Sequence, residues 1–188
     1  MIMNTKVLQR SISKVFPNKN IALTIEILFL LFIGVTAMAI HAKLRIPMQL
    51  PGKHGVLFMA ILISARGLSR FPYANTLSGI GAATILLTGA LGFTHPFMPL
   101  IYLFLGVVMD LLFAFFSRLS SNVLVISIAG GLSWMFIPLS RLFFGVFATF
   151  ESKAMVESVY FPFLTHFIFG YIGALIGLGA LQIFSVKK

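Results

Sequence analysis

Six apolar stretches follow one another along this chain, separated by short connections that carry charged, Pro or Gly residues. A helix that crosses a bilayer needs about 20 mostly apolar residues. The stretches cover residues 21–42, 55–68, 74–92, 97–116, 123–147 and 161–184. The pattern predicts an all-α integral membrane protein, a compact bundle of six transmembrane helices that forms a single domain over residues 1–188. The second stretch is short, so we expect that helix to be tilted or to begin below the membrane surface.

The composition supports lipid as the solvent of this chain. Hydrophobic residues make up 59% of its 188 residues and charged residues only 10%. A soluble domain keeps roughly a quarter of its residues charged, because water must wet its surface. The mean hydropathy of +1.04 therefore excludes a soluble globular fold. Residues 1–20 form a basic segment with no cleavage site after it, so the first stretch is expected to be a retained helix.

The basic residues predict the orientation in the membrane. The chain has 14 Lys and Arg residues against four acidic ones, a formal net charge of +10, and most of them lie in the connections. Cytoplasmic connections are enriched in Lys and Arg. With the N-terminus inside, the cytoplasmic side holds Lys6, Arg10, Lys14, Lys19, Arg66, Arg70, Arg118, Lys187 and Lys188, and the outer side holds Lys43, Arg45, Lys53 and Lys153. We expect both termini in the cytoplasm, the inner (cytoplasmic) membrane as the location, and no nucleic-acid partner.

Small residues at close spacing mark three of the predicted helices. Gly173 and Gly177 form a G-x-x-x-G pattern in the last one, Gly130 and Gly131 are neighbours in the fifth, and the third is rich in Gly and Ala. Such spacings let helix backbones approach closely in a membrane. They favour tight packing within the bundle, with a docking face for a partner as the alternative.

The sequence motifs of common catalytic and nucleotide sites are missing. The chain has no G-x-x-x-x-G-K-[ST] phosphate loop, no H-E-x-x-H helix and no G-x-S-x-G elbow. It has no cysteine, and its four histidines lack the spacing of metal ligands. We therefore expect no enzymatic activity, no cofactor and no metal site. Any uphill transport must then draw its energy from another chain.

Basic and imidazole side chains gather toward the outer side of the predicted bundle. Ionisable residues at membrane depth are costly and indicate function by default. From a rise of about 1.5 Å per residue, Arg141 is expected roughly 10 Å and His166 about 7 Å below the outer surface. His95, Lys53 and His54 fall at the outer turns. Because no acid shares this level within a span, the group predicts a site for a small anionic solute.

Some of these residues also have structural interpretations. Arg141 can extend to the outer headgroups or bond the helix carbonyls that Pro138 frees. His166 by itself fits a packing histidine. Trp134, the only tryptophan, lies too deep for an interfacial residue and suits either a core position or a stacking wall for a ring. Asp110, about 20 Å below the outer surface, favours a structural pair with Arg118 or Arg66.

The first predicted helix and the connection after it carry a family resemblance. Gly34, Ala37, Ala39 and Ala42 lead directly into Leu44-Arg-Ile-Pro47-Met-Gln-Leu-Pro51-Gly52. An alanine-bearing first helix followed by an outer Ile-Pro-x-x-Leu-Pro-Gly loop, in a chain of this size, resembles the substrate-binding S component of an energy-coupling factor (ECF) vitamin transporter. The family's Ala-x-x-x-Ala pattern is not exact, since His41 follows Ala37 by four residues.

The resemblance implies a lid and a pocket. In the family the connection between the first two helices, residues 43–55 here, closes over a pocket formed mainly by helices four to six. By that likeness the lid contains Gln49, Lys53 and His54, and the pocket contains Trp134, Arg141 and His166.

The resemblance also implies partners. The first helices of the family dock on a transmembrane coupling subunit that two ATPase subunits drive, which assigns the docking surface to Gly34, Ala37, Ala39 and Ala42. The chain is then expected to bind a small anionic, vitamin-like metabolite from outside, with membrane lipid around it.

Two other interpretations stay open. An MreD-like scaffold of the cell-shape machinery is also small, basic and multi-span, and it needs no ligand. A self-contained secondary carrier needs a coupling-ion site at mid-depth, for which Asp110 is the candidate.

Overall fold

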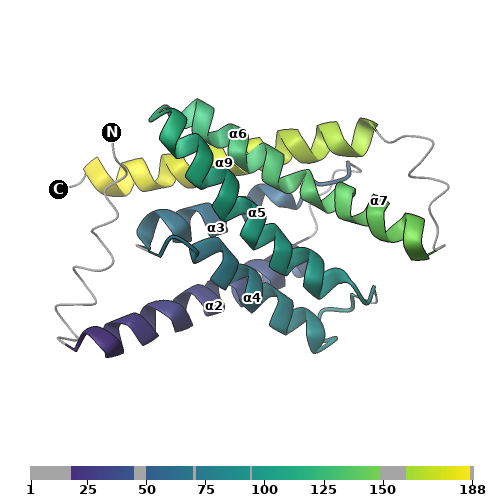
Figure 1. The fold of residues 1–188 in the computed structure, drawn as a ribbon, viewed down its shortest axis with the longest axis horizontal. Coiled ribbons are helices and arrows are strands. Elements are labelled where there is room, and N and C mark those ends of the chain that lie inside the picture. The colour runs from purple at the N-terminus through teal and green to yellow at the C-terminus, as the bar shows by residue number, and fades with distance from the viewer. Residues whose placement is uncertain (1–17, 45–49, 70, 94, 149–159, 187–188) are drawn as a thin grey trace.

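The computed structural model describes residues 18–44, 50–69, 71–93, 95–148 and 160–186 (Figure 1). Within these ranges every regular element is an α-helix. The helices are α2 (Lys19–Lys43), α3 (Gly55–Leu68), α4 (Ala74–Leu87), α5 (Met98–Leu119), α6 (Val123–Trp134), α7 (Phe136–Ala148) and α9 (Tyr160–Val186). The prediction of an all-α chain is confirmed for the described residues.

Four helical segments have the length and composition of a membrane crossing. They are α2, α5, the α6–α7 unit from Val123 to Phe144, and α9 from Tyr160 to Ile183. Helices α3 and α4 are apolar but have only 14 residues each, about 21 Å against a hydrocarbon thickness of about 30 Å. The long apolar helices fit a membrane-embedded protein, and α3 and α4 together form a shorter helical hairpin inside it.

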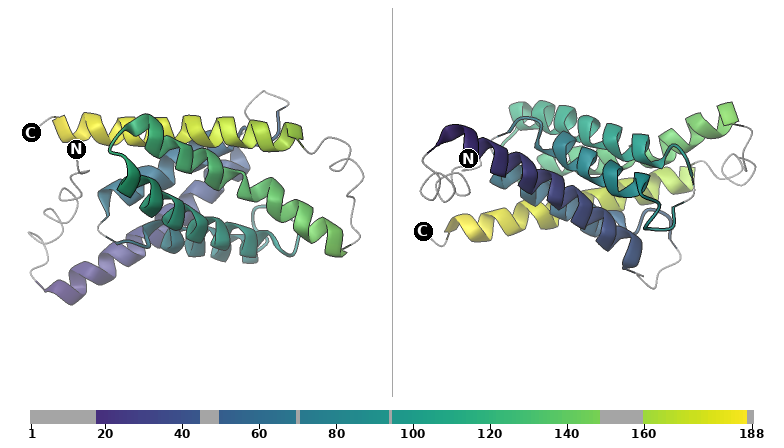
Figure 2. Two further views of the ribbon diagram at one scale, coloured as in Figure 1. Left: turned by 45° about the horizontal axis from the view of Figure 1, so that its top comes forward. Right: turned by 90° about the horizontal axis from the view of Figure 1, so that it is seen from below.

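The helices close into a ring. Each helix contacts the next in the order α2, α4, α5, α6, α9 and α3, and α3 in turn contacts α2. The start of α2 and the end of α9 lie at the same end of the bundle (Figures 1 and 2). Helix α7 has few contacts with the other helices and diverges from α9 along its length.

Glycines allow two of the ring's interfaces to close. In α2, a side chain at Gly34 would collide with the backbone of Ser78 in α4, whose hydroxyl donates to the Leu30 carbonyl at 3.1 Å. In α9, a Cβ at Gly173 would lie 2.6 Å from the Val56 carbonyl oxygen of α3, and one at Gly177 would lie 2.8 Å from that of Ala60. The small residues at these positions therefore serve packing within the chain.

This packing corrects part of the expected docking surface. Gly34 and Ala37 are buried against neighbouring helices, so in this structure they are not accessible to a partner. Ala39 and Ala42 are half-buried.

Two predicted boundaries differ from the structure. The third helix ends at Leu87 instead of residue 92, because Gly89 and Gly92 take left-handed backbone conformations with φ of 69° and 74°. The fifth is broken at Met135, which separates α6 from α7. Pro138 explains this break, since its ring excludes the carbonyl of Trp134 four residues earlier and it has no N–H to offer that carbonyl.

Buried polar side chains fasten the turn between α3 and α4. Asp110 of α5 pairs with Arg66 at the end of α3. Its carboxylate also accepts from the Asn75 amide at 3.2 Å, the Thr76 amide at 2.8 Å and the Thr76 hydroxyl at 2.7 Å. A carboxylate at these first amides of α4 satisfies unpaired N–H groups and suits the helix dipole. Of the two pairs expected for Asp110, the structure thus forms the one with Arg66.

A second acid, Glu26 of α2, holds the same turn through Ser69. The Ser69 hydroxyl donates to Oε1 of Glu26 in α2 at 2.6 Å and accepts from the Phe71 amide at 3.0 Å. Arg66 donates to the Pro72 carbonyl at 3.0 Å. Both acids in the described part of the chain therefore bind this one turn.

Replacing Asp110 with Ala should destabilise the bundle strongly. Arg66 would keep a largely buried charge without its partner, which costs about 3–5 kcal/mol, and the first amides of α4 would lose their acceptor. The measurement is the unfolding midpoint in detergent. The control is Arg118→Ala, which removes an exposed cation from the same helix and should leave the midpoint nearly unchanged. Equal effects of the two variants would contradict the Arg66 pairing.

Candidate functional site

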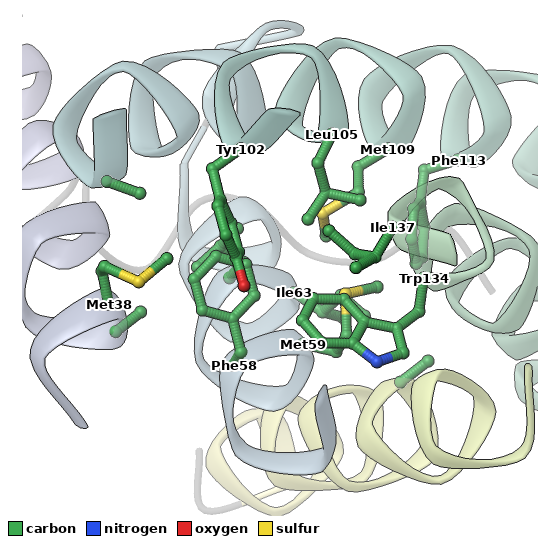
Figure 3. Packing of buried hydrophobic residues seen from close by; sticks show 14 of the residues in the cluster. Met38, Phe58, Met59, Ile63, Tyr102, Leu105, Met109, Phe113, Trp134 and Ile137 are labelled. Atoms are coloured by element: carbon green, nitrogen blue, oxygen red, sulfur yellow. The ribbon is translucent and has the colours of Figure 1, made fainter. Parts of the chain in front are cut away.

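A cluster of rings surrounds His41, near the end of α2. Its imidazole lies 5.4 Å from the ring of His54, 5.8 Å from those of Phe58 and Tyr102, and 6.0 Å from that of Trp134, centroid to centroid. Figure 3 shows Phe58, Tyr102 and Trp134 facing one another from α3, α5 and α6. We call these five residues, with Phe93 and His166, the His41 cluster.

The segment of residues 50–54 closes over one side of this cluster. The indole N–H of Trp134 donates to the Gly52 carbonyl at 3.1 Å. Gly52 has a φ of 80°, and a Cβ added there would lie 2.8 Å from the ring of His166. A Cβ at Gly55 would collide with the indole of Trp134. The segment reaches this position because glycines stand where it touches the two rings.

Hydrogen bonds fix some of the imidazoles and leave others open. Nδ1 of His166 lies 2.6 Å from the Pro162 carbonyl, and since a carbonyl only accepts, that nitrogen carries the proton. Nε2 of His41 contacts the Tyr102 hydroxyl at 3.1 Å. The Nδ1 atoms of His41 and His54 are buried without a hydrogen-bond partner. The backbone of His54 approaches the ring of His41, and that of Leu44 approaches the ring of His54.

The electrostatic surroundings of the cluster are positive. Burial lowers the pKa of His54, and the neighbouring charge of Lys53 lowers it further. The guanidinium of Arg141 is close enough to act electrostatically on His41, Tyr102 and His166. Among the described residues no carboxylate pairs with Arg141. The cluster thus disfavours extra positive charge and suits an anion.

The structure brings together only part of the predicted site. Trp134 and His166 are stacked at 6.1 Å, and His54 joins them through His41, with Lys53 half-buried beside it. The other predicted members do not line the cluster in this way. Arg141 is exposed on α7, His95 is exposed and its ring contacts Phe97, and Gln49 lies outside the described residues.

Sequence reasoning missed the central residue. His41 was interpreted only as a departure from an alanine pattern, yet it continues the buried face of α2 that runs through Leu30, Gly34, Ala37 and Met38. Spacings of three and four residues along this face place His41 toward the interior. Nothing in the sequence alone pointed to Phe58 or Tyr102 among the 21 Phe and four Tyr residues.

The cluster is distinct from the apolar groove on the surface. That groove has a volume of about 650 Å³ and lies where α9 begins beside the α6–α7 break; its lining residues are Met135, Tyr160, Phe161, Phe163, Leu164 and Phe167. Its lining is almost wholly apolar, as expected of a surface in contact with lipid. Within the described ranges no group of three or more His, Asp or Glu residues could hold a metal ion.

Comparison of the chain with known protein families, with curated proteins and with solved structures found no match.

Replacing Trp134 with Phe should loosen the 50–54 segment while keeping a ring in the cluster. The variant loses the bond to the Gly52 carbonyl, a contribution of about 1 kcal/mol. Hydrogen exchange of residues 50–58 should then accelerate roughly fivefold, if closure limits it. Exchange in the body of α5 is the internal control. An unchanged rate at 50–58 would show that the indole does not hold the segment.

Proposed function

We propose that this chain is the solute-binding membrane subunit of an ATP-driven importer of the ECF type, and that it captures a small anionic, vitamin-like metabolite from outside. The observation that carries the proposal is the seating of residues 50–54 over Trp134 and His166. A connection between the first two helices that covers a ring-lined, positive cluster is what a solute-binding subunit requires.

The proposed orientation has six crossings with both termini in the cytoplasm. The positive-inside rule favours it, and it agrees with the start of α2 and the end of α9 lying at one end of the bundle. Residues 50–54 then lie on the outer side, where solute arrives. The polar turn between α3 and α4 lies in the cytoplasmic half.

The energy for uptake comes from partners in this proposal. The sequence contains no phosphate loop, so a transmembrane coupling subunit and two ATPase subunits supply the driving force. The cycle consists of solute binding, closure of residues 50–54, and reorientation of the bundle by those partners. Ala39 and Ala42 are the remaining members of the expected docking surface.

The polar residues argue against the two alternative functions. A secondary carrier needs a titratable or ion-binding residue that changes partners, whereas Asp110 is already engaged by Arg66 and the first amides of α4. A scaffold needs only internally satisfied polar groups. The two buried imidazole nitrogens without partners favour a protein that binds a ligand.

The test compares two glycine variants at left-handed positions. Gly52→Ala and Gly92→Ala share a backbone penalty of about 1–2 kcal/mol. The first also places a methyl 2.8 Å from the His166 ring, while the second meets nothing within 4 Å. Native mass spectrometry of the full chain, purified from cells grown in rich medium, should show a bound small molecule in the wild type and in Gly92→Ala but not in Gly52→Ala.

The same molecule should enter expressing cells only while ATP is available. A wild-type chain that carries no small molecule from any medium would overturn the proposal in favour of a scaffold. Uptake that persists without ATP would overturn it in favour of a carrier.

A further inference from the structure

Two imidazole nitrogens at the centre of the site lack the partner that burial demands. Nδ1 of His41 and Nδ1 of His54 are both buried and unbonded. An unsatisfied buried polar atom costs about 1–3 kcal/mol, and native proteins rarely leave one without a reason. The two rings come from different elements, α2 and the 50–54 segment, and lie 5.4 Å apart. A single bound group can therefore accept hydrogen bonds from both imidazoles when the 50–54 segment closes over it.

The charges around the rings of His41 and His54 indicate the sign of the charge on the bound group. The titratable neighbours are Lys53 on the segment itself, Arg141 from α7, His166 from α9 and Tyr102 from α5. None of them is negative at neutral pH. The carboxylates in the described part of the chain, on Glu26 and Asp110, are bound at the α3–α4 turn. Because no described carboxylate lies beside the two imidazoles, an anion would bring them a countercharge.

The walls of the site specify the shape of the ligand. The imidazole of His41 lies beside four aromatic rings, those of Phe58, Phe93, Tyr102 and Trp134. Trp134 and His166 are inclined by only 26° at 6.1 Å. Stacked rings are separated by about 3.5 Å, so a small parting of this pair when residues 50–54 lift would admit one flat ring.

We propose that the ligand is a planar aromatic acid whose carboxylate binds the imidazoles of His41 and His54 and whose ring packs against Trp134, with one proton taken up on binding. This inference rests on the proposed function, because it identifies the solute of the same site.

The sign of the proton linkage follows from the surroundings of His54. Burial and the charge of Lys53 lower the pKa of His54, so the imidazole is neutral near pH 7. A carboxylate beside it favours the protonated ring and raises that pKa. The complex therefore holds more protons than the free chain near neutral pH. Affinity should rise as pH falls, by up to about tenfold per pH unit for one proton.

The experiment uses Trp134 as its reporter, because it is the only tryptophan of the chain. The full chain in lipid nanodiscs is titrated with benzoate and 3-pyridinecarboxylate, and its emission is followed. Benzamide has the ring without the charge, and cyclohexanecarboxylate has the charge without the flat ring. Both aromatic acids should give saturable changes that strengthen from about pH 7.5 to about pH 6.5. The two control compounds should bind at least about tenfold more weakly.

Variants distinguish the contribution of the imidazole nitrogens to binding from that of the aromatic rings. His41→Phe keeps a ring but removes both nitrogens, and it should weaken binding of the aromatic acids at least about tenfold. His41→Gln and His54→Gln keep a donor that cannot be protonated, so binding should persist in both, and the pH dependence should weaken in His54→Gln. His95→Phe is the matched control, because His95 is exposed and contacts Phe97 instead of the cluster. Unfolding midpoints verify that each variant is folded.

Three results would overturn the inference: equal binding of benzamide, affinity independent of pH, or unchanged affinity in folded His41→Phe. Failure of both aromatic acids to bind, while the wild type still carries a molecule that Gly52→Ala loses, would reject the ligand class and leave the importer proposal standing. Binding of the aromatic acids without ATP-dependent uptake would support the site and reject the importer.

Discussion

The turn between α3 and α4 has to satisfy its backbone groups inside the protein, because Ser69 and Asn75 at its two ends are buried. Unpaired N–H and C=O groups cost several kcal/mol each where water is absent. Asp110 answers this constraint by accepting from the first amides of α4 while neutralising Arg66. Glu26 holds the turn from α2 through Ser69. Two acids thus hold the turn that joins the two short helices.

That anchor also positions the candidate site. Helix α3 is fastened at one end by Arg66 and packs at the other through Gly55 directly against Trp134. Phe58, one turn into α3, lies 5.5 Å from the same indole. Because α3 is short and held at its C-terminal end, the 50–54 segment that precedes it starts from a defined point beside the His41 cluster. Loss of the Arg66–Asp110 pair would therefore move the 50–54 segment as well as destabilise the bundle.

The sequence predicted the apolar helices well because their signal is local. The bounds of α2 and α3 follow from where apolar runs meet charged or glycine residues, and the Arg66 pairing was one of two possibilities for Asp110. The break at Met135 depends on Pro138, and an apolar run alone does not show whether its proline bends a helix or divides it. The site was predicted less well, because its members meet through tertiary packing. Depth estimates along each helix placed Arg141 and His95 near the site but carried no information on the direction of their side chains, and both are exposed.

The charge distribution links the two halves of the molecule. Glu26 and Asp110, the acids of the described chain, are both engaged at the α3–α4 turn, so no described carboxylate is left for the His41 cluster. In the proposed orientation, positive charge at the His41 cluster opposes the topology that the rest of the chain favours, and burial of unbonded imidazole nitrogens adds a further cost. Under the proposed function, both costs would fall when an anion gives the imidazoles an acceptor. In the proposed function, the unbonded imidazole nitrogens favour binding of an anionic solute, and closure of residues 50–54 over the site would then remove that solute from water.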